Sequence, residues 1–206
     1  MVSTSLPVIG VVALLAIVCC WRPWLQRRRH GSSGILFFRS GDWGQKLRDA
    51  LGTVLVVCLL GQGIAAAGWP DALAPVRAIY HPEVRIWQAT GALFLFGGLL
   101  LLIVAQLHLG ASWRIGINEG TSPGLVTSGL YRVCRNPIFL AILITLTGYT
   151  VLVPTRLSLA LLLGAFIGIR QQVLTEEAYL LRAYGDDYRE YARRVGRFLP
   201  ALGLLR

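Results

Sequence analysis

The sequence predicts an all-α polytopic integral membrane protein with about five transmembrane helices and a C-terminal amphipathic helical segment. Its 206 residues are 55% hydrophobic and only 15% charged, which is too apolar for an ordinary soluble domain. The apolar residues gather in runs that approach the roughly 20 residues needed to cross a bilayer. No run alternates like a β-barrel strand, and hydrocarbon offers no partner to bare peptide groups, so we expect helical spans.

Five spans are expected along the chain. In order, they are Leu6–Trp21, Leu51–Gly68, Val84–Leu109, Ile138–Val153, and Leu157–Ile169 running on toward Leu174. Asn136 and Pro137 mark the start of the fourth span, because Asn accepts from free N–H groups at an N-cap and Pro suits the first helical position. The expected division is an N-terminal three-span membrane region, residues 1–109, followed by residues 110–206. The second part would hold a cytoplasmic loop, a two-helix hairpin and the C-terminal amphipathic helices.

The segment after the fifth span predicts two amphipathic helices. Apolar residues in the range Val173–Tyr184 recur at roughly helical spacing. Gly185 predicts a stop, and Asp186 or Asp187 can cap a second short helix that reaches Arg194.

The distribution of charge predicts the orientation. Seventeen of the twenty Arg and Lys residues fall in the ranges 22–48, 114–135 and 170–206. The positive-inside rule assigns these ranges to the cytoplasm, so the N-terminus is expected outside and the C-terminus inside. The first apolar run is not read as a secretory signal, because its basic cluster, Arg27–Arg29, follows it. The expected location is the plasma membrane of a bacterium.

The sequence does not predict a disulfide framework, a dinucleotide-binding motif or a metal site. The four cysteines form neither a disulfide framework nor a CxxC pair. The glycine-rich stretch Gly61–Ala66 lies inside a span, where small residues favour close helix packing over dinucleotide binding. His30, His81 and His108 are too scattered to predict a metal site. Membrane lipids are the expected partners; nucleic acid is not, and the oligomeric state is not predicted.

A polar segment and a pair of acids mark the two ends of the apolar hairpin. The segment Leu125–Phe139 leads into the hairpin, and Glu176 and Glu177 follow it. Both ends of such a hairpin reach the same membrane surface, so we expect one site there. Paired carboxylates near a bilayer are costly unless they are solvated, paired or functional. One Glu is expected to point into the site and the other to face the cytoplasm as a surface charge.

In this order, these residues resemble the isoprenylcysteine carboxyl methyltransferase family and its phospholipid-methyltransferase relatives, over about residues 105–200. The matching elements are Leu125–Tyr131, Arg135–Phe139, the apolar hairpin Ile138–Ile169, the pair Glu176–Glu177, and Gly185–Tyr191. The resemblance implies that residues 110–206 are a methyltransferase core. It also implies a cytoplasm-facing pocket for S-adenosylmethionine that opens sideways to a lipophilic, isoprenoid or lipid acceptor.

By the same resemblance, a set of side chains and backbone groups would hold the cofactor. They are Leu125, Val126, Tyr131, Arg135, Asn136, Pro137, Phe139 and Glu176. Glu176 would bind the charged amino-acid end, because a carboxylate pairs with an α-ammonium group.

Three residues are candidates for a catalytic role. An amine or hydroxyl acceptor needs a base, which Glu177 or His108 can supply. Arg170 is the arginine nearest to the position, four residues before the first Glu, where the family carries a substrate-binding arginine. That position is Gln172, and Arg170 lies about 200° around the helix from it. We therefore hypothesise that the acceptor is not the usual prenylcysteine carboxylate.

Asn136 and Phe139 also depart from the family pattern, which has His and Tyr there. Asn keeps a donor and an acceptor but loses the titratable ring. Two other functions stay open at this point. One is a membrane NADPH-dependent reductase of the sterol-reductase kind, and the other is a non-enzymatic membrane scaffold or lipid-binding protein.

Overall fold

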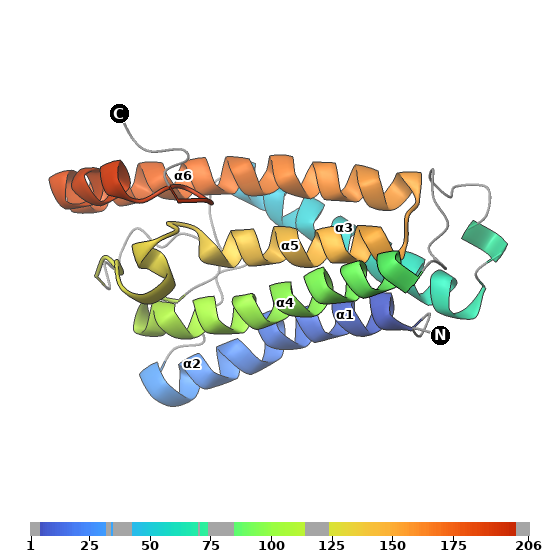
Figure 1. Ribbon diagram of the computed structural model, residues 1–206. Helices are drawn as coiled ribbons and strands as arrows, with labels where there is room; N and C mark the ends of the chain where they lie inside the picture. Colours follow the sequence, from blue (N-terminus) through green and yellow to red (C-terminus); the bar gives the residue numbers. More distant parts are fainter. Residues whose placement is uncertain are drawn as a thin grey trace.

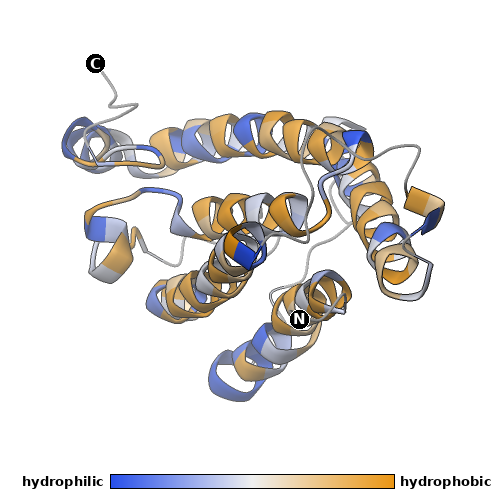
Figure 2. Ribbon diagram, turned by 45° about the vertical axis from the view of Figure 1, so that its right-hand side comes forward, coloured by the Kyte–Doolittle hydropathy of each residue, from blue (hydrophilic) through white to orange (hydrophobic). Residues whose placement is uncertain are grey.

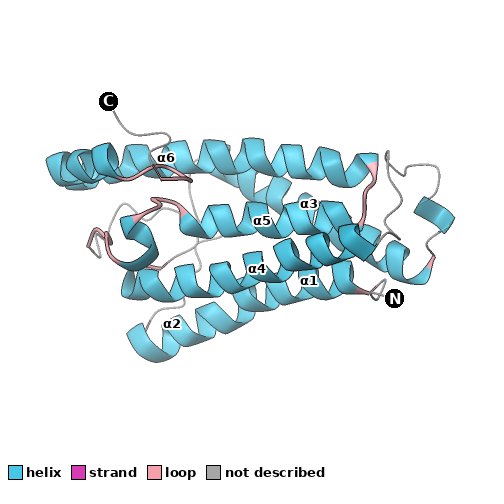
Figure 3. Cartoon of the chain, in the orientation of Figure 1, coloured by secondary structure: helices cyan, strands magenta, loops and turns pink. Residues whose placement is uncertain are grey.

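Every element of the computed structural model is helical across the described residues, which are 5–31, 34, 43–69, 71–73, 85–113 and 124–200 (Figures 1 and 3). An N-terminal rod consists of α1 (Leu6–Leu15), a π-helical segment η1 (Ala16–Trp21) and α2 (Arg22–His30). The remaining α-helices are α3 (Trp43–Gly68), α4 (Arg85–Leu109), α5 (Pro137–Leu152) and α6 (Arg156–Arg194). Two 3₁₀ turns, η3 (Gly110–Ser112) and η4 (Gly129–Arg132), separate α4 from α5.

The predicted all-α membrane architecture is confirmed. Four helices are long and apolar enough to cross a membrane, namely Leu6–His30, Trp43–Gly68, Arg85–Ser112 and Arg156–Arg194. The fourth expected span, α5, is a shorter apolar helix of 16 residues. Hydrophobic residues make up most of the helices, and polar residues gather at the ends of α2 and α6 (Figure 2).

Three helix boundaries differ from those expected. The first helix runs on to His30, and the second begins at Trp43 rather than Leu51. The early turns of α3 are polar but internally satisfied, because Gln45 donates to Asp49 over 2.8 Å. The two expected C-terminal helices are the continuation of α6, which is interrupted at Gly185 by a non-helical backbone with φ 53° and ψ −122°. The range 114–123, where the cytoplasmic loop was expected, lies outside the described residues.

The centre of the bundle is the close contact of α4 with α5. Leu95 is fully buried there, with 0% exposure. A Cβ added to Gly148 would lie 2.7 Å from the carbonyl oxygen of Gly91 and 2.8 Å from the Cα of Leu95. Small residues of this kind let two membrane helices approach backbone to backbone.

Gly148→Ala is therefore expected to lower the free energy of unfolding by about 1–3 kcal/mol through overpacking. Gly164→Ala on α6 is the matched control, because a Cβ there meets nothing within 4 Å. The control should be neutral or slightly stabilising, since Ala is the better helix former. Thermal unfolding of both variants in detergent measures the difference, and equal midpoints would contradict the close contact.

The far end of the hairpin is fastened by polar groups. Thr155 and Ser158 form a reciprocal capping box at the start of α6. Gln62 of α3 donates to the Thr155 hydroxyl, and the Tyr149 hydroxyl donates to the carbonyl of Leu59 over 2.7 Å. These contacts tie α3 to the α5–α6 turn and leave the opposite ends of α5 and α6 to build the site.

Candidate functional site

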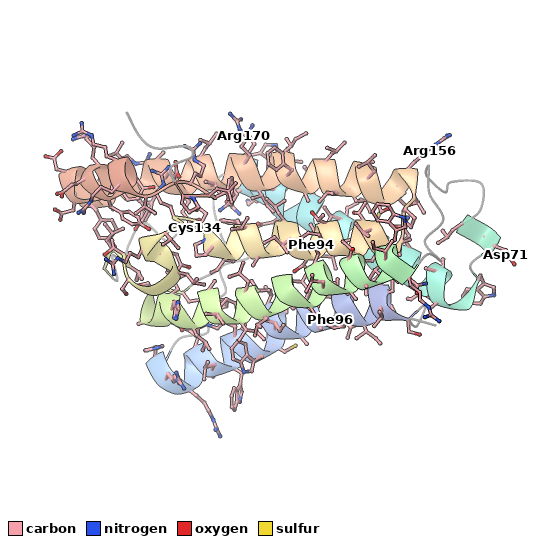
Figure 4. All side chains as sticks on the ribbon, viewed as in Figure 1. Asp71, Phe94, Phe96, Cys134, Arg156 and Arg170 are labelled. Atoms are coloured by element: carbon pink, nitrogen blue, oxygen red, sulfur yellow. The ribbon has the colours of Figure 1, made fainter. Side chains whose placement is uncertain are left out.

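The start of α5 is paired with the chain that follows α6. Cys134 and Gly196 form an isolated parallel β-bridge. The Arg135 N–H donates to the carbonyl of Gly196 over 2.9 Å, and the Asn136 N–H donates to Arg197 over 3.1 Å. Figure 4 shows Cys134 near the beginning of α5. The polar segment and the C-terminal end of α6 therefore form one unit, as the hairpin predicted.

Glu177 is the centre of a buried ion-pair cluster. It is 8% exposed, and its Oε1 lies 3.0 Å from Nη2 of Arg135. Arg197 donates from Nη2 over 2.7 Å and from Nε over 3.0 and 3.1 Å to the two carboxylate oxygens. Hydrogen bonding to Glu177 raises the pKa of Arg197. Both carboxylate oxygens of Glu177 are thus in contact with arginine side chains.

This cluster corrects the expectation that one acid is a plain surface charge. Glu177 is buried and Glu176 is half-buried. Adjacent residues on a helix differ by about 100° in direction, so the two carboxylates leave α6 in different directions. Glu177 contacts Arg135 and Arg197.

Glu176 interacts electrostatically with Tyr131 of η4. Tyr131 is 7% exposed, and its carbonyl accepts from the Tyr191 hydroxyl over 2.6 Å. Burial raises the pKa of the Tyr131 phenol, and the negative charge of Glu176 raises it further. Glu176 and Tyr131 therefore lie within electrostatic range of each other, from α6 and η4 respectively.

Asn136 occupies the N-cap position of α5 but does not cap it. Its side chain makes no capping hydrogen bond; instead Nδ2 donates to the carbonyl of Arg197 over 3.2 Å and to Glu177 over 3.5 Å. The predicted capping bond is therefore wrong, although Pro137 does open the helix. The amide is drawn away because the chain beyond α6 presents an acceptor next to it.

Leu125 and Val126 follow Gly124, whose backbone N–H and carbonyl are both hydrogen-bonded. The N–H of Gly124 donates to the Tyr184 hydroxyl over 3.2 Å, and its carbonyl accepts from Ser112 over 3.4 Å. Leu125 also packs against an apolar cluster on and after α6, which consists of Tyr188, Tyr191, Ala192 and Val195. Leu125, Val126 and Phe139 are half-buried, and Pro137 is buried.

His108 lies beside the site and is engaged by the backbone. Its Nδ1 accepts from the Leu130 N–H over 3.1 Å. A Cβ on Gly129, which has φ +59°, would meet that nitrogen at 2.7 Å. His108 therefore fastens η4 to the end of α4, which is the role of a satisfied interfacial histidine.

Arg170 is exposed on α6 (Figure 4), so the structure does not bring it into the buried cluster with Glu177. Gln172, by contrast, accepts a hydrogen bond from Nε of Arg48 over 3.0 Å. The position where the resemblance calls for an arginine is thus contacted by an arginine from α3. No local sequence pattern predicts this contact, because 124 residues separate the two partners.

Comparison with known proteins gives the class. A family model described as phospholipid methyltransferase matches residues 86–187. The eukaryotic intramembrane Ras methyltransferase ICMT (isoprenylcysteine carboxyl methyltransferase) shares the fold, with a TM-score of 0.53 and 18% identity over 98% of this chain and 95% of that one.

Curated relatives include a protein-S-isoprenylcysteine O-methyltransferase of Schizosaccharomyces pombe, which is 28% identical over 72% of this chain and 64% of the relative. The cobalt-zinc-cadmium resistance protein CzcN of Cupriavidus metallidurans is 32% identical over 58% of this chain and 56% of its own length. Methanethiol S-methyltransferase 1 of Bradyrhizobium diazoefficiens is 30% identical over 46% of this chain and 32% of the relative. The matches thus span between about a third and two thirds of these relatives.

The fold defines an integral membrane protein, and its residues 86–187 match the phospholipid methyltransferase family model. The chain is similar in fold to isoprenylcysteine carboxyl methyltransferase and in sequence to the protein-S-isoprenylcysteine O-methyltransferase of Schizosaccharomyces pombe.

Proposed function

We propose that this protein is an integral membrane methyltransferase that uses S-adenosylmethionine to methylate a lipophilic acceptor. The observation that carries the proposal is the meeting of the polar segment with α6 and the chain after it, through the bridge of Cys134 with Gly196 and the hydrogen bond from the Tyr191 hydroxyl to the carbonyl of Tyr131. The methyltransferase names of several relatives support the same reaction class.

The residues fit such a donor. When bound, S-adenosylmethionine supplies a methyl group on a sulfonium. The Glu176 carboxylate offers a partner to the α-ammonium group, while Leu125, Val126, Tyr131 and Phe139 offer apolar surface to the purine. Methyl transfer depends mainly on alignment and exclusion of water, so rigid walls matter more than reactive side chains.

The remaining assigned residues receive supporting roles in this proposal. Arg135 and Asn136 hold the start of α5 against α6 and the chain after it through Glu177 and Arg197, and Pro137 opens α5. Glu177 serves as an anchor rather than a base, because both of its oxygens are taken by arginines. His108 holds η4, and Arg170 has no assigned role.

The acceptor would approach from lipid. The exposed faces of the helices are apolar, with Leu163 56% and Ile167 61% exposed on α6. The ends of α2 and α6 that carry the basic residues lie at the same end of the bundle as the site (Figures 1 and 2). By the positive-inside rule this end would face the cytoplasm, where a water-soluble donor is available, and the membrane would be the plasma membrane of a bacterium.

Thermal unfolding of the purified protein with S-adenosylhomocysteine or NADPH tests the proposal. Saturating S-adenosylhomocysteine, at about 100 times its Kd, should stabilise the protein by about 2.7 kcal/mol. NADPH should leave the midpoint unchanged. Stabilisation by NADPH alone would favour a sterol-type reductase, and stabilisation by neither would favour a scaffold or lipid-binding role. Methyl-labelled cofactor added to native membranes would then identify the acceptor.

A further inference from the structure

The N-terminal rod lies outside the matched range 86–187, yet it buries two polar side chains deeply. Arg22 and Gln26 of α2 are each 2% exposed, whereas Arg27–Arg29 on the same helix are exposed. A guanidinium removed from water is costly in a membrane protein unless it has a specific task. Arg22 therefore calls for an explanation.

The π-helical segment turns Arg22 inward. α1 packs on α4 through Gly10, whose added Cβ would lie 2.6 Å from the side chain of Leu95. In an unbroken α-helix, residue 22 would point about 80° away from the buried Leu14. The i→i+5 pattern of η1 uses about one more residue per turn and rotates the chain back toward α4. Such segments occur frequently at functional sites.

Arg22 and Gln26 hold the turn η3 at the end of α4. Nη2 of Arg22 donates to the carbonyl of Gly110 over 2.6 Å, and the Gln26 amide donates to Ala111 over 3.0 Å. The guanidinium carbon also lies 4.9 Å from the centre of the Trp113 ring, within cation–π range. A cation and donors at a helix C-terminus satisfy carbonyls that the helix leaves unpaired.

The turn η3 is linked directly to the site. Its last residue, Ser112, donates to the carbonyl of Gly124 over 3.4 Å, and Leu125 and Val126 follow immediately. On the other side, Tyr184 of α6 accepts from the Gly124 N–H. Burial raises the pKa of Tyr131, and the positive charge of Arg22 partly opposes that rise. Arg22 therefore interacts electrostatically with η4.

Arg22 is a costlier group at this position than a simple cap requires. Within the described part of the chain, its buried Nε has no hydrogen-bond partner, and neither has Oε1 of Gln26. Unpaired buried groups are costly, and a single neutral donor would cap the turn with less desolvation. The cost is consistent with a group retained for the geometry that it imposes.

We propose that Arg22 is a positioning residue for the donor site: through η3 and Gly124 it fixes the edge formed by Leu125 and Val126. This inference rests on the proposed function. The N-terminal rod is then part of the methyltransferase unit rather than a membrane anchor alone.

The test compares full-length Arg22→Met, Arg22→Lys and Leu14→Ala proteins. Leu14→Ala is the matched control, because Leu14 is a buried core residue of the same rod that lies away from η3. Arg22→Met should weaken S-adenosylhomocysteine binding at least tenfold by calorimetry. In the ligand-free protein it should also speed hydrogen exchange at the amides of Gly124–Val126. Arg22→Lys should recover part of the affinity, since it keeps one cationic donor.

Leu14→Ala should lower the unfolding midpoint while changing the Kd less than twofold. A wild-type Kd in Arg22→Met, or an equal loss of affinity in Leu14→Ala, would overturn the inference. The exchange measurement separates the two proposals. If the wild type does not bind S-adenosylhomocysteine but exchange at Gly124–Val126 still rises in Arg22→Met, the proposed function fails while the link from Arg22 to this edge stands.

Discussion

Replacing Glu177 by Gln is expected to lower the free energy of unfolding by about 3–5 kcal/mol, the usual effect of breaking a buried ion pair from one side. The neutral amide would remove the negative charge that pairs with Arg135, whose side chain is 2% exposed. Arg197 would lose the carboxylate that ties the chain after α6 to the start of α5. Thermal unfolding in detergent measures the effect.

Glu190→Gln is the matched control. Glu190 pairs with Arg194 one turn away, but the two side chains are 72% and 70% exposed. Exposed pairs contribute about 0–1 kcal/mol, so this variant should unfold close to the wild type. If Glu177→Gln were as stable as the wild type but lost methyl transfer alone, the carboxylate would act as the base considered from the sequence.

Replacing Glu176 should mainly weaken ligand binding, whereas replacing Glu177 should mainly lower stability. Glu176→Gln is expected to weaken S-adenosylhomocysteine binding by roughly 10- to 150-fold, the equivalent of one charge-assisted hydrogen bond of about 1.5–3 kcal/mol. Glu176 is only half-buried, whereas Glu177 is buried, so the ligand-free protein should keep more of its stability than Glu177→Gln does. Calorimetric titration beside the unfolding midpoint separates affinity from stability.

An unchanged Kd in Glu176→Gln would show that another group binds the amino-acid end of the donor. The pair of variants is informative together, because the two acids are adjacent in sequence and identical in chemistry. Loss of affinity at one and loss of stability at the other would assign each carboxylate a separate partner.

Helix positions were predictable wherever hydropathy decides them. The third and fourth spans were expected at Val84–Leu109 and Ile138–Val153, and α4 and α5 occupy nearly those ranges. The start of α3 was missed because its first turns carry charged and amide side chains, which hydropathy counts against a span. Those groups are satisfied by one another and by Gln172 of α6, a distant partner that no local pattern reveals.

The sequence predicts which segments come together at the site, but not the side-chain contacts between them. The order of motifs placed the polar segment beside the acids, and the hairpin brought them together. The role of Glu177 depends on Arg197, which has no local signal, and the capping expected of Asn136 was displaced by the same segment. The π-helical rotation that buries Arg22 is likewise a packing outcome that composition does not encode.

The length of α6 fixes the depth of the two acids. The part of α6 before the interruption at Gly185 extends about 43 Å at 1.5 Å per residue, while the hydrocarbon layer is only about 30 Å thick. Counted from Arg156, about 20 residues reach the far edge of that layer, which falls just before Glu176. Under the proposed function, a donor dissolved in water and an acceptor dissolved in the hydrocarbon layer would meet at this level without either leaving its preferred solvent.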